Sequence, residues 1–343
     1  MSTEKSLVYY VPVKGNLSNL IEKEVSLPAL KSNEVCICIR NIGLNFADIF
    51  AILGLYSATP KGGFVPGLEF SGIVEGVGHA VSHIAIGDRV MGVTRFGGYT
   101  NRLHIDARYV MKIPVLWSFE EGAAFPVQAL TAYYALFTLG ELKAGQTVLI
   151  HSAAGGVGLL ANRMAKSVNA FTIGTVGRAE KIPLLRKEGY DATIVRSRNF
   201  SKDLREIHNG RNLHLVLDSI GGRIFKESFK ALAPMGRIIV YGSAVYGSTG
   251  NRPNWIKILY TYLTRPRIDP QTMIQNNVSV LGFNLIWLYE EVDLMLNIFD
   301  NIAHMNLPSP YIGHKFSWYE LPQALKLFQS GSTVGKIVVG VTI

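Results

Sequence analysis

Cysteine is scarce in this sequence, in which Cys36 and Cys38 are the only thiols among 343 residues. Two cysteines are too few for a disulfide framework or for a four-thiolate zinc site. The two residues alternate with apolar neighbours, so they point to the same face of a predicted strand. We therefore expect two buried thiols in a reducing compartment.

Long apolar runs are absent as well. The most apolar late segment, 281–299, contains Glu290, Glu291 and Asp293, and no uninterrupted run reaches the roughly 20 residues that a membrane-spanning helix needs. The first residues are polar and lead into an apolar run that Pro12 breaks, unlike the long apolar core of a signal peptide. These features predict a soluble, cytoplasmic protein.

Charged residues make up only 17% of the chain, whereas 48% of the residues are hydrophobic, which excludes intrinsic disorder over most of the length. The formal net charge is +9. Because the basic residues are spread along the chain and no recognised nucleic-acid motif accompanies them, we interpret the charge as a generally basic surface. We expect no nucleic-acid partner.

The order of the predicted elements indicates an α/β fold with two domains. Up to residue 124, short extended runs such as 34–40 and 71–78 alternate with turn residues, which predicts a mostly β domain. From 125 to 285, short apolar runs alternate with helix-like stretches, which predicts βαβ units in a doubly wound parallel sheet. Residues 286–343 are too few to fold alone, so we expect them to complete the first domain.

A glycine-rich turn follows the first buried strand of the second domain. The run fits G-x-G-x-x-G, with Ala153 in the first glycine place, Gly155 where the backbone approaches a pyrophosphate and Gly158 where helix packs on strand. The alternative is a tight strand-to-helix turn without a ligand. Because βαβ units follow, the pattern favours dinucleotide binding. The residues assigned to the cofactor here are Ala154, Gly155, Gly156, Val157 and Gly158.

The end of the next strand predicts which dinucleotide binds. NAD sites have an acidic residue about 20 positions after the glycine turn, which holds the ribose 2′-hydroxyl. Here Val176 lies near that position and Arg178 and Lys181 follow, so a 2′-phosphate would be attracted rather than repelled. Glu180 leaves NAD open, as does the alternative that the two cations merely start a solvated helix. We predict NADPH as the cofactor.

Short motifs occur in a fixed order along the chain, at 43–48, 54–56, 66–72, 87–90, 130–133, 153–158 and 335–336. Together they resemble the medium-chain dehydrogenase/reductase superfamily, in its zinc-independent quinone oxidoreductase branch. The late run 276–283 looks most like the subgroup around the vesicle amine transport protein. The resemblance implies a GroES-like catalytic domain (1–124 and 286–343), a Rossmann domain (125–285) and an active site in the cleft between them.

The resemblance also bears on metals. In zinc-dependent members of the superfamily, the metal ligands fall where this chain has Asn45, Leu68 and Val127, none of which is an ordinary zinc ligand. The four-cysteine structural zinc loop is missing too. His residues show no close pairing suited to a metal, and His151 is interpreted as an interior histidine with hydrogen-bond partners. We therefore predict no bound metal.

Without a metal, the site can stabilise the anion formed by hydride transfer only weakly, so the acceptor must need little such help. An isolated ketone that receives hydride forms a localised alkoxide, which needs a Lewis acid or a proton donor beside it. A quinone or a conjugated enone delocalises the charge, so positioning and a few hydrogen-bond donors suffice. The resemblance implies the same reaction, namely hydride transfer from NADPH to a quinone or an α,β-unsaturated carbonyl.

Contact residues follow from the matched motifs. Asn45 and Asp48 match the loop that borders nicotinamide and substrate in the family, and Tyr56 matches a tyrosine of the same cleft; these three are the candidate catalytic residues. For Asp48, local capping or pairing near a turn is an equal alternative. The further residues expected to face the cofactor are Thr131, Tyr241, Gly242, Ser243, Phe283, Asn284 and Lys336.

Two surfaces suggest partners. The exposed-looking edge run 278–281 predicts pairing with a second subunit's sheet, hence a homodimer, unless the helix at 286–302 covers that edge. The apolar stripe 255–263, flanked by basic residues, predicts either a lid or interface helix or a helix on a membrane surface. The rival to the reductase is therefore an NADPH-binding, membrane-associated or regulatory protein with little turnover.

Overall fold

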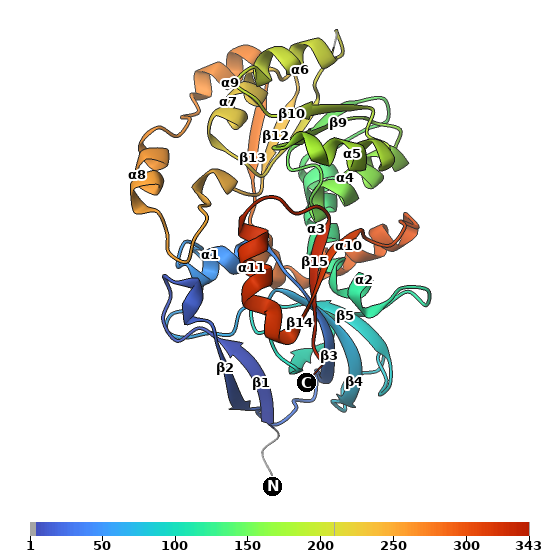
Figure 1. The fold of residues 1–343 in the computed structure, drawn as a ribbon. Helices are drawn as coiled ribbons and strands as arrows, with labels where there is room; N and C mark the ends of the chain where they lie inside the picture. The colour runs from blue at the N-terminus through green and yellow to red at the C-terminus, as the bar shows by residue number, and fades with distance from the viewer. Residues whose placement is uncertain (1–4, 209, 343) are drawn as a thin grey trace. The chain divides into compact units, whose positions relative to one another are not determined.

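The computed structural model describes residues 5–208 and 210–342 and divides the chain into two compact units (Figure 1). Unit 1 comprises the chain up to Val127, Ser248–Pro253 and the chain from Ser309. Unit 2 comprises Gln128–Gly247 and Asn254–Pro308. This is the predicted α/β architecture, a β-rich unit completed by the C-terminal tail and a doubly wound unit inserted into it.

Unit 2 is built on a six-stranded parallel sheet in the order β10-β9-β8-β11-β12-β13. The order reverses direction between β8 and β11, and the carboxyl ends of strands at such a switch point form the ligand crevice of doubly wound sheets. The strands are β8 (Thr147–Ile150), β9 (Phe171–Val176), β10 (Ala192–Val195), β11 (Leu215–Asp218), β12 (Arg237–Val240) and β13 (Ser279–Gly282).

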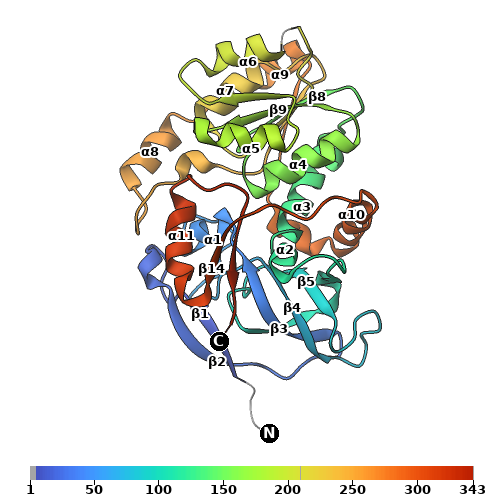
Figure 2. The ribbon, with the colours of Figure 1, turned by 45° about the vertical axis from the view of Figure 1, so that its right-hand side comes forward.

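Helices cover both faces of this sheet, with α4 and α5 on one face and α6 and α7 on the other (Figure 2). Because both faces are covered, β8 and β11 are buried along their whole length and consist almost entirely of aliphatic residues. The helices of unit 2 are α4 (Gly156–Ser167), α5 (Ile182–Lys187), α6 (Phe200–His208), α7 (Gly222–Lys230), α8 (Trp255–Leu263), α9 (Pro270–Asn276) and α10 (Val292–His304).

Unit 1 contains a seven-stranded sheet in the order β14-β15-β3-β4-β5-β7, with β6 paired to β3. The C-terminal strand β15 lies between β14 and β3, so the tail is an integral part of this sheet, as predicted. Its strands are β3 (Glu34–Gly43), β4 (Glu69–Val77), β5 (Arg89–Val93), β6 (Arg102–Asp106), β7 (Val110–Lys112), β14 (Ile312–Ser317) and β15 (Lys336–Gly340). A separate hairpin pairs β1 (Lys5–Tyr10) with β2 (Ile21–Ser26).

The core of unit 1 joins segments that are far apart in the sequence. Trp318 is fully buried, and its ring lies 4.6 Å from that of Tyr9, centroid to centroid. The indole N–H also donates to Glu22 on β2 at 2.6 Å, which satisfies the polar end of the side chain. The helices of this unit include α1 (Phe46–Ile52), α2 (Phe119–Ala123) and α11 (Leu321–Gln329); α3 (Pro126–Tyr133) crosses the division between units.

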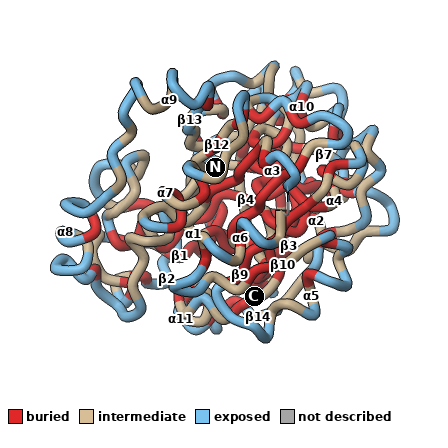
Figure 3. The backbone as a smooth tube through the Cα atoms, turned by 90° about the horizontal axis from the view of Figure 1, so that it is seen from above, coloured by how far each residue is buried: buried red, intermediate tan, exposed pale blue. Residues whose placement is uncertain are grey.

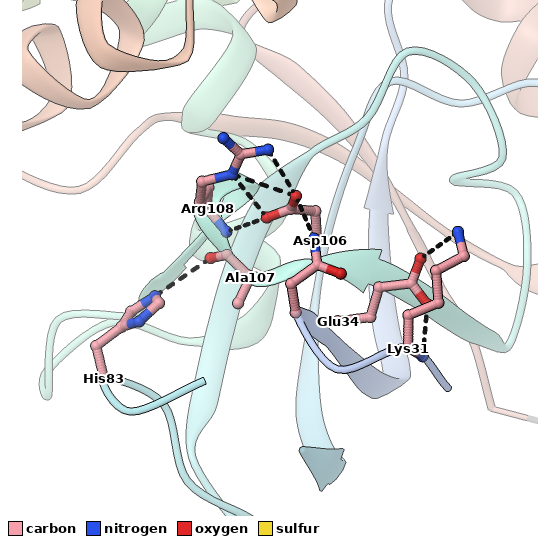
Figure 4. Close-up of polar contacts among 7 residues, drawn as sticks. Lys31, Glu34, His83, Asp106, Ala107 and Arg108 are labelled. Carbon is pink, nitrogen blue, oxygen red and sulfur yellow. Dashed lines mark hydrogen bonds and ion pairs between the residues drawn. The ribbon is translucent and has the colours of Figure 1, made fainter. Parts of the chain in front are cut away.

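Polar contacts fix the turn before the start of β3 and the turn after the end of β6 (Figure 4). Asp106 accepts from the backbone N–H of Arg108 at 3.0 Å and from its guanidinium at 2.8 Å. Lys31 pairs with Glu34 at 3.0 Å, and the ring of His83 bonds the Ala107 carbonyl at 3.3 Å. These contacts define strand ends and involve none of the candidate site residues.

The division differs most from the predicted boundaries after residue 285, and it also differs at 125–127 and at Ser248–Pro253, which belong to unit 1. We predicted that 286–343 would complete the first domain, whereas the segment up to Pro308 belongs to unit 2. The physical reason is apolar packing within unit 2. Leu130 of α3 lines a small apolar pocket together with Met295 and Ile298 of α10, so the helix is held by residues on the second unit's side.

Cys36 and Cys38 are both free and lie on β3. Cys36 is buried, as predicted, but Cys38 is half-buried. A register irregularity of the β3–β4 pairing falls between Cys36 and Ile37, which breaks the simple alternation on which the prediction depended.

The stripe at 255–263 forms α8, and most of this helix is exposed (Figure 3). Trp255 is 64% exposed and Ile256 is 85% exposed, with Tyr260 at 69%. Only Thr261 of this helix is buried. Among the described residues, no helix combines the length and the apolar character needed to cross a membrane.

Candidate functional site

A buried carboxylate, Glu69, joins the candidate catalytic residue Asn45 to Lys336 and Val127 in unit 1. Its Oε1 accepts from Asn45 Nδ2 at 2.9 Å and from the Lys336 ammonium at 2.5 Å. Its Oε2 accepts from the backbone N–H of Val127 at 3.0 Å. Glu69 and Lys336 are 0% and 3% exposed, so their ion pair is shielded from water.

Gly43 permits this close arrangement at the end of β3. A Cβ at this position would lie 2.1 Å from the Ala123 carbonyl and 2.8 Å from Glu69 Oε1. Asn45 follows in extended backbone and begins α1 as its N-cap. A larger residue at 43 would displace the carboxylate, so the glycine is required by packing.

Asp48 is both a cap and a buried acid. Its Oδ2 accepts from the backbone N–H of Asn45 at 2.8 Å and from the Tyr99 hydroxyl at 2.9 Å. The other oxygen, Oδ1, is buried and has no hydrogen-bond partner among the described residues. Burial raises the pKa of Asp48 to about 7, because desolvation outweighs these hydrogen bonds and the positive charge of Lys336. The capping interaction that the sequence left open is therefore present.

Lys336, predicted to face the cofactor, lies among the catalytic candidates. Its ammonium donates to Asn45 Oδ1 at 3.0 Å as well as to Glu69. Burial lowers the pKa of Lys336, while the Glu69 carboxylate opposes this shift. The structure thus joins Asn45 and Lys336, which are 291 positions apart in the chain.

Tyr56 is half-buried and packs against the core of unit 1 shortly after α1. Its carbonyl accepts from the Thr59 hydroxyl at 2.7 Å and from the Thr59 backbone N–H at 3.1 Å. This turn fixes the backbone at Tyr56. The phenol's role toward a substrate stays a prediction.

In unit 2, the glycine turn connects β8 to α4. A Cβ at Gly158 would lie 2.6 Å from Ala153 Cα, so this glycine allows the helix to pack directly on the strand end. A Cβ at Gly155 would meet only the Ser152 carbonyl, at 3.2 Å, which leaves the outer side of the turn open. The first N–H groups of α4, at Gly156, Val157 and Gly158, are the donors that an anion such as a pyrophosphate accepts from.

A group of cations lies beside this turn, at the carboxyl end of β9. Arg178 is exposed and pairs loosely with Glu180 at 3.7 Å. Burial lowers the pKa of Lys181, and the neighbouring positive charges of Arg178 and Arg196 lower it further. A dianion placed among them would relieve their mutual repulsion.

Arg196 was missed by the sequence reasoning. Its backbone N–H donates to the Val176 carbonyl at 2.8 Å, and its guanidinium donates to the Thr175 carbonyl and hydroxyl at 3.0 and 2.9 Å. Nη2 lies 3.4 Å from where a Cβ of Gly177 would be. The available signal was a basic residue directly after β10, whose end lies beside that of β9 in a parallel sheet.

Aromatic rings gather at the carboxyl ends of β12 and β13. Phe283 lies 6.1 Å from the Tyr241 ring in a stacked arrangement and 4.9 Å from the Tyr134 ring in an edge arrangement. Burial raises the pKa of Tyr241. Tyr134 was not predicted. The structure therefore brings Tyr241 and Phe283 together, with Gly242, Ser243 and Asn284 in the adjoining backbone.

Thr131 lies on α3 and is 7% exposed. One turn before it, Gln128 approaches the glycine turn, since its Cγ lies 3.1 Å from where a Cβ of Gly156 would be. Thr131 is therefore on a helix that borders the start of α4. His151 is fully buried, and its ring nitrogens bond the hydroxyls of Thr175 and Ser228, as predicted for an interior histidine.

Comparisons with known proteins agree with this geometry. Residues 156–300 match the family model described as zinc-binding dehydrogenase, and residues 31–115 match the alcohol dehydrogenase GroES-like domain. The human synaptic vesicle membrane protein VAT-1 homolog is 31% identical over 315 residues, which span 91% of this chain and 80% of the relative. The chain belongs to the medium-chain dehydrogenase/reductase superfamily. Within it, the VAT-1-like subgroup that the sequence resembles is confirmed.

A zebrafish VAT-1 homolog is 34% identical over 91% of this chain, and the chain spans 65% of the length of that relative. Two solved structures with NADPH share the fold. A mycobacterial protein complexed with NADPH has 27% identity and a TM-score of 0.83, covering 98% of this chain and 100% of the other. An Escherichia coli quinone oxidoreductase complexed with NADPH has 26% identity and a TM-score of 0.80, with the same coverage.

The name of the first family model implies zinc, and the residues present do not fit it. Where zinc members have ligands, this chain has a carboxamide, an isobutyl side chain and a valine. The carboxamide of Asn45 is hydrogen-bonded to an ammonium, a group that repels a metal cation. Across residues 5–208 and 210–342, no three His, Cys, Asp or Glu side chains lie together in a way that would hold a metal ion.

Proposed function

We propose that this chain is an NADPH-dependent reductase that transfers hydride to a quinone or an α,β-unsaturated carbonyl without a metal. The coarser part of this statement follows from its family, whose members named above include a quinone oxidoreductase that binds NADPH. The finer part rests on residues of both units.

The cations at the end of β9 carry the cofactor assignment. Arg178, Lys181 and Arg196 supply positive charge where NAD-specific proteins have an acid, and Val176 occupies the place of that acid. Arginine binds a phosphate through paired N–H donors, and Arg196 is already held in place by Thr175. The glycine turn and the start of α4 would accept the pyrophosphate. This is the observation that favours NADPH.

The donor set of unit 1 supports the acceptor class. Asn45 has its amide N–H groups directed to Glu69 and to the Gly43 carbonyl, and Asp48 accepts two hydrogen bonds of its own. The Lys336 ammonium beside them donates to Asn45 and Glu69, so the site offers little stabilisation to a localised alkoxide. A quinone or conjugated enone needs less, because its product anion is delocalised. Tyr56 is the proposed additional donor or wall.

The experiment that tests this proposal is NADPH oxidation, followed at 340 nm, against a panel of quinones, enones, isolated ketones and aldehydes. We expect turnover with quinones or enones and none with isolated ketones. NADPH binding without turnover of any acceptor would contradict the reductase assignment. Turnover of isolated ketones alone would contradict the acceptor class.

One observation favours a second candidate function, binding to an anionic membrane surface. The side chains of α8 expose a tryptophan, two tyrosines and three aliphatic residues, and Arg265 lies over the Tyr262 ring at 3.7 Å. Exposed aromatics beside cations are typical of helices that lie in a lipid interface. The further cations are Lys257 within this helix and Arg252 and Arg267 on either side of it.

Cosedimentation with vesicles separates the two candidates. We expect binding to vesicles that contain phosphatidylserine and none to phosphatidylcholine vesicles if α8 is a membrane helix. Trp255→Ser with Ile256→Ser should abolish that binding, while Leu116→Ser, which changes an apolar residue that is 95% exposed in unit 1, serves as the control. Equal sedimentation of all variants would overturn a role for α8.

A further inference from the structure

The place that holds the metal in zinc-dependent relatives is organised differently here. Two of the three positions that match zinc ligands, Asn45 and Val127, are joined by the two oxygens of Glu69. The third, Leu68, is a buried apolar residue. The positive charge near these positions belongs to the Lys336 ammonium, which contacts Asn45 and Glu69.

The ammonium determines the orientation of the Asn45 carboxamide. Oδ1 of Asn45 accepts from Lys336 at 3.0 Å, while Nδ2 donates to Glu69 at 2.9 Å and to the Gly43 carbonyl at 3.2 Å. Exchanging the two ends of the amide would place N–H groups against an ammonium and a carbonyl oxygen against a carboxylate. An ammonium has donors only, so that exchange is strongly disfavoured.

The backbone holds Lys336 beside Asn45 as well. β15 lies next to β3, and the N–H of Leu44 donates to the carbonyl of Ile337 at 3.0 Å, one residue away from each partner of the side-chain contact. A buried ammonium needs a compensating charge, which Glu69 supplies at 2.5 Å. The cation is therefore fixed by a sheet, a carboxylate and an amide.

We propose that Lys336 is a positioning residue that organises this site in place of a metal, acting through Asn45 and Glu69 rather than by contacting the cofactor. It keeps the carboxamide of Asn45 in one orientation and holds the ends of β3 and β4 and the start of α3 together through Glu69. The part of this inference that concerns turnover rests on the proposed reductase function. The part that concerns Asn45 does not.

Lys336→Met is the first test, because methionine has a similar length and no charge. We expect turnover to fall about 10- to 100-fold, as for a small misplacement of a reacting group, while the Kd for NADPH measured by fluorescence stays within about twofold. The control is Lys315→Met on the neighbouring strand β14, whose exposed pair with Glu120 should leave both quantities unchanged. An NADPH Kd raised tenfold or more in Lys336→Met would overturn the proposal in favour of a cofactor contact.

The single variant leaves Glu69 buried without its partner, so it is expected to raise the equilibrium constant for unfolding by about 100-fold or more. The double variant Lys336→Met with Glu69→Gln removes both charges and should recover most of that stability. If Lys336 positions Asn45, turnover stays low in the stable double variant. Recovery of turnover along with stability would overturn the proposal, because the pair would then be purely structural.

A measurement that needs no turnover completes the test. In protein labelled with ¹⁵N-asparagine, the side-chain amide of Asn45, assigned with Asn45→Ser, should exchange slowly with solvent in the unaltered chain and in Lys315→Met. In the double variant it should exchange at least about tenfold faster, since the ammonium and carboxylate no longer hold it. Equal exchange rates would overturn the proposal. A chain without reductase turnover but with this difference would contradict the proposed function and leave the role of Lys336 supported.

Discussion

The guanidinium of Arg196 donates to both oxygens of Thr175, the carbonyl at 3.0 Å and the hydroxyl at 2.9 Å. This pair fixes an otherwise flexible side chain at the end of β9, next to Gly177. A preorganised arginine loses little conformational entropy when it binds an anion. The 2′-phosphate of NADPH is the ligand that we propose for it.

The first prediction concerns this arginine. Arg196→Gln should raise the Kd for NADPH about 10- to 100-fold, as expected for the loss of a hydrogen bond to a charged group, and should leave the Kd for NADH nearly unchanged. Reversing the charges of both Arg178 and Lys181 should also erase the preference for NADPH over NADH. Fluorescence titration with both cofactors measures this, with Arg205→Gln on α6 as the control. Equal affinity of the unaltered chain for NADPH and NADH would contradict the assignment.

The sequence could not place Arg196 in this group because the residue follows Val176 by 20 positions and belongs to the next βαβ unit. Only strand pairing, through the bond from its N–H to the Val176 carbonyl, brings the two together. The glycine turn was easier to predict, since it is local and its spacing is set by one strand and one helix. For the same reason the alternation of strands and helices over 125–285 could be predicted.

Contacts between segments that are far apart in the sequence also explain what could not be predicted about Asn45 and about α10. The motif around Asn45 was recognisable, but its bonds to Glu69 and Lys336 span 24 and 291 positions. A helix was predicted at 286–302, where α10 lies at Val292–His304. The unit to which it belongs depends on the apolar residues that it contacts. Neither fact is encoded in a local pattern.

The second prediction concerns Asp48 and pH. Burial raises its pKa to about 7 in the folded chain, from 3.8 in the unfolded chain. The folded state therefore retains the proton between these values, and the stability from Asp48 is fully present below about pH 4 and is lost as the pH rises through 7. The loss is about 4 kcal/mol, at roughly 1.4 kcal/mol for each pKa unit. Tyr99, Glu69 and Lys336 are the groups that face this carboxyl.

Asp48→Asn should reduce this pH dependence, because the amide oxygen can still accept from the N–H of Asn45 and from Tyr99 but carries no charge. Urea denaturation at pH 5 and pH 8 measures the effect. The unaltered chain should lose more stability between these pH values than Asp48→Asn does. Asp293→Asn, an exposed acid of α10, is the control. If the unaltered chain and Asp48→Asn lose the same stability between pH 5 and pH 8, Asp48 is ionised at both pH values.

The third prediction concerns metal. Because the carboxamide of Asn45 contacts an ammonium and Leu68 offers no ligand, prolonged chelation should leave turnover and the unfolding midpoint unchanged. Elemental analysis of active, purified protein should find no stoichiometric zinc. One zinc per chain, lost together with activity on chelation, would be decisive against the prediction.

The fourth prediction concerns oligomeric state. β13 is the last strand of its sheet, and Ser279 and Gly282 are exposed, so the edge remains available within the described chain. An open parallel edge favours pairing with another strand. We expect a homodimer at micromolar concentration, measured by light scattering, and a monomer when Val280→Pro removes an edge donor. A monomeric mass for the unaltered chain would contradict this prediction.

The fifth prediction concerns the chemical step and Tyr56. Tyr56→Phe removes one hydroxyl donor and keeps the ring, and the loss of a fully used oxyanion donor would cost about 100-fold in turnover. We expect a smaller loss with quinones, because water can protonate a stabilised hydroquinone anion. The loss should be larger with enones, whose enolate is more basic. Asn45→Ala should reduce turnover of both, since its carboxamide is shared with Glu69 and Lys336.

The comparison of acceptors separates two roles for the phenol. Tyr319→Phe, at an exposed tyrosine of unit 1, controls for the loss of a hydroxyl elsewhere. If Tyr56 only assists a delocalised anion, the ratio of enone to quinone turnover falls in Tyr56→Phe while the NADPH Kd stays constant. If Tyr56→Phe abolishes quinone reduction with fold and NADPH affinity unchanged, positioning and diffuse hydrogen bonding do not supply most of the rate. Tyr56 is then the acid of the reaction.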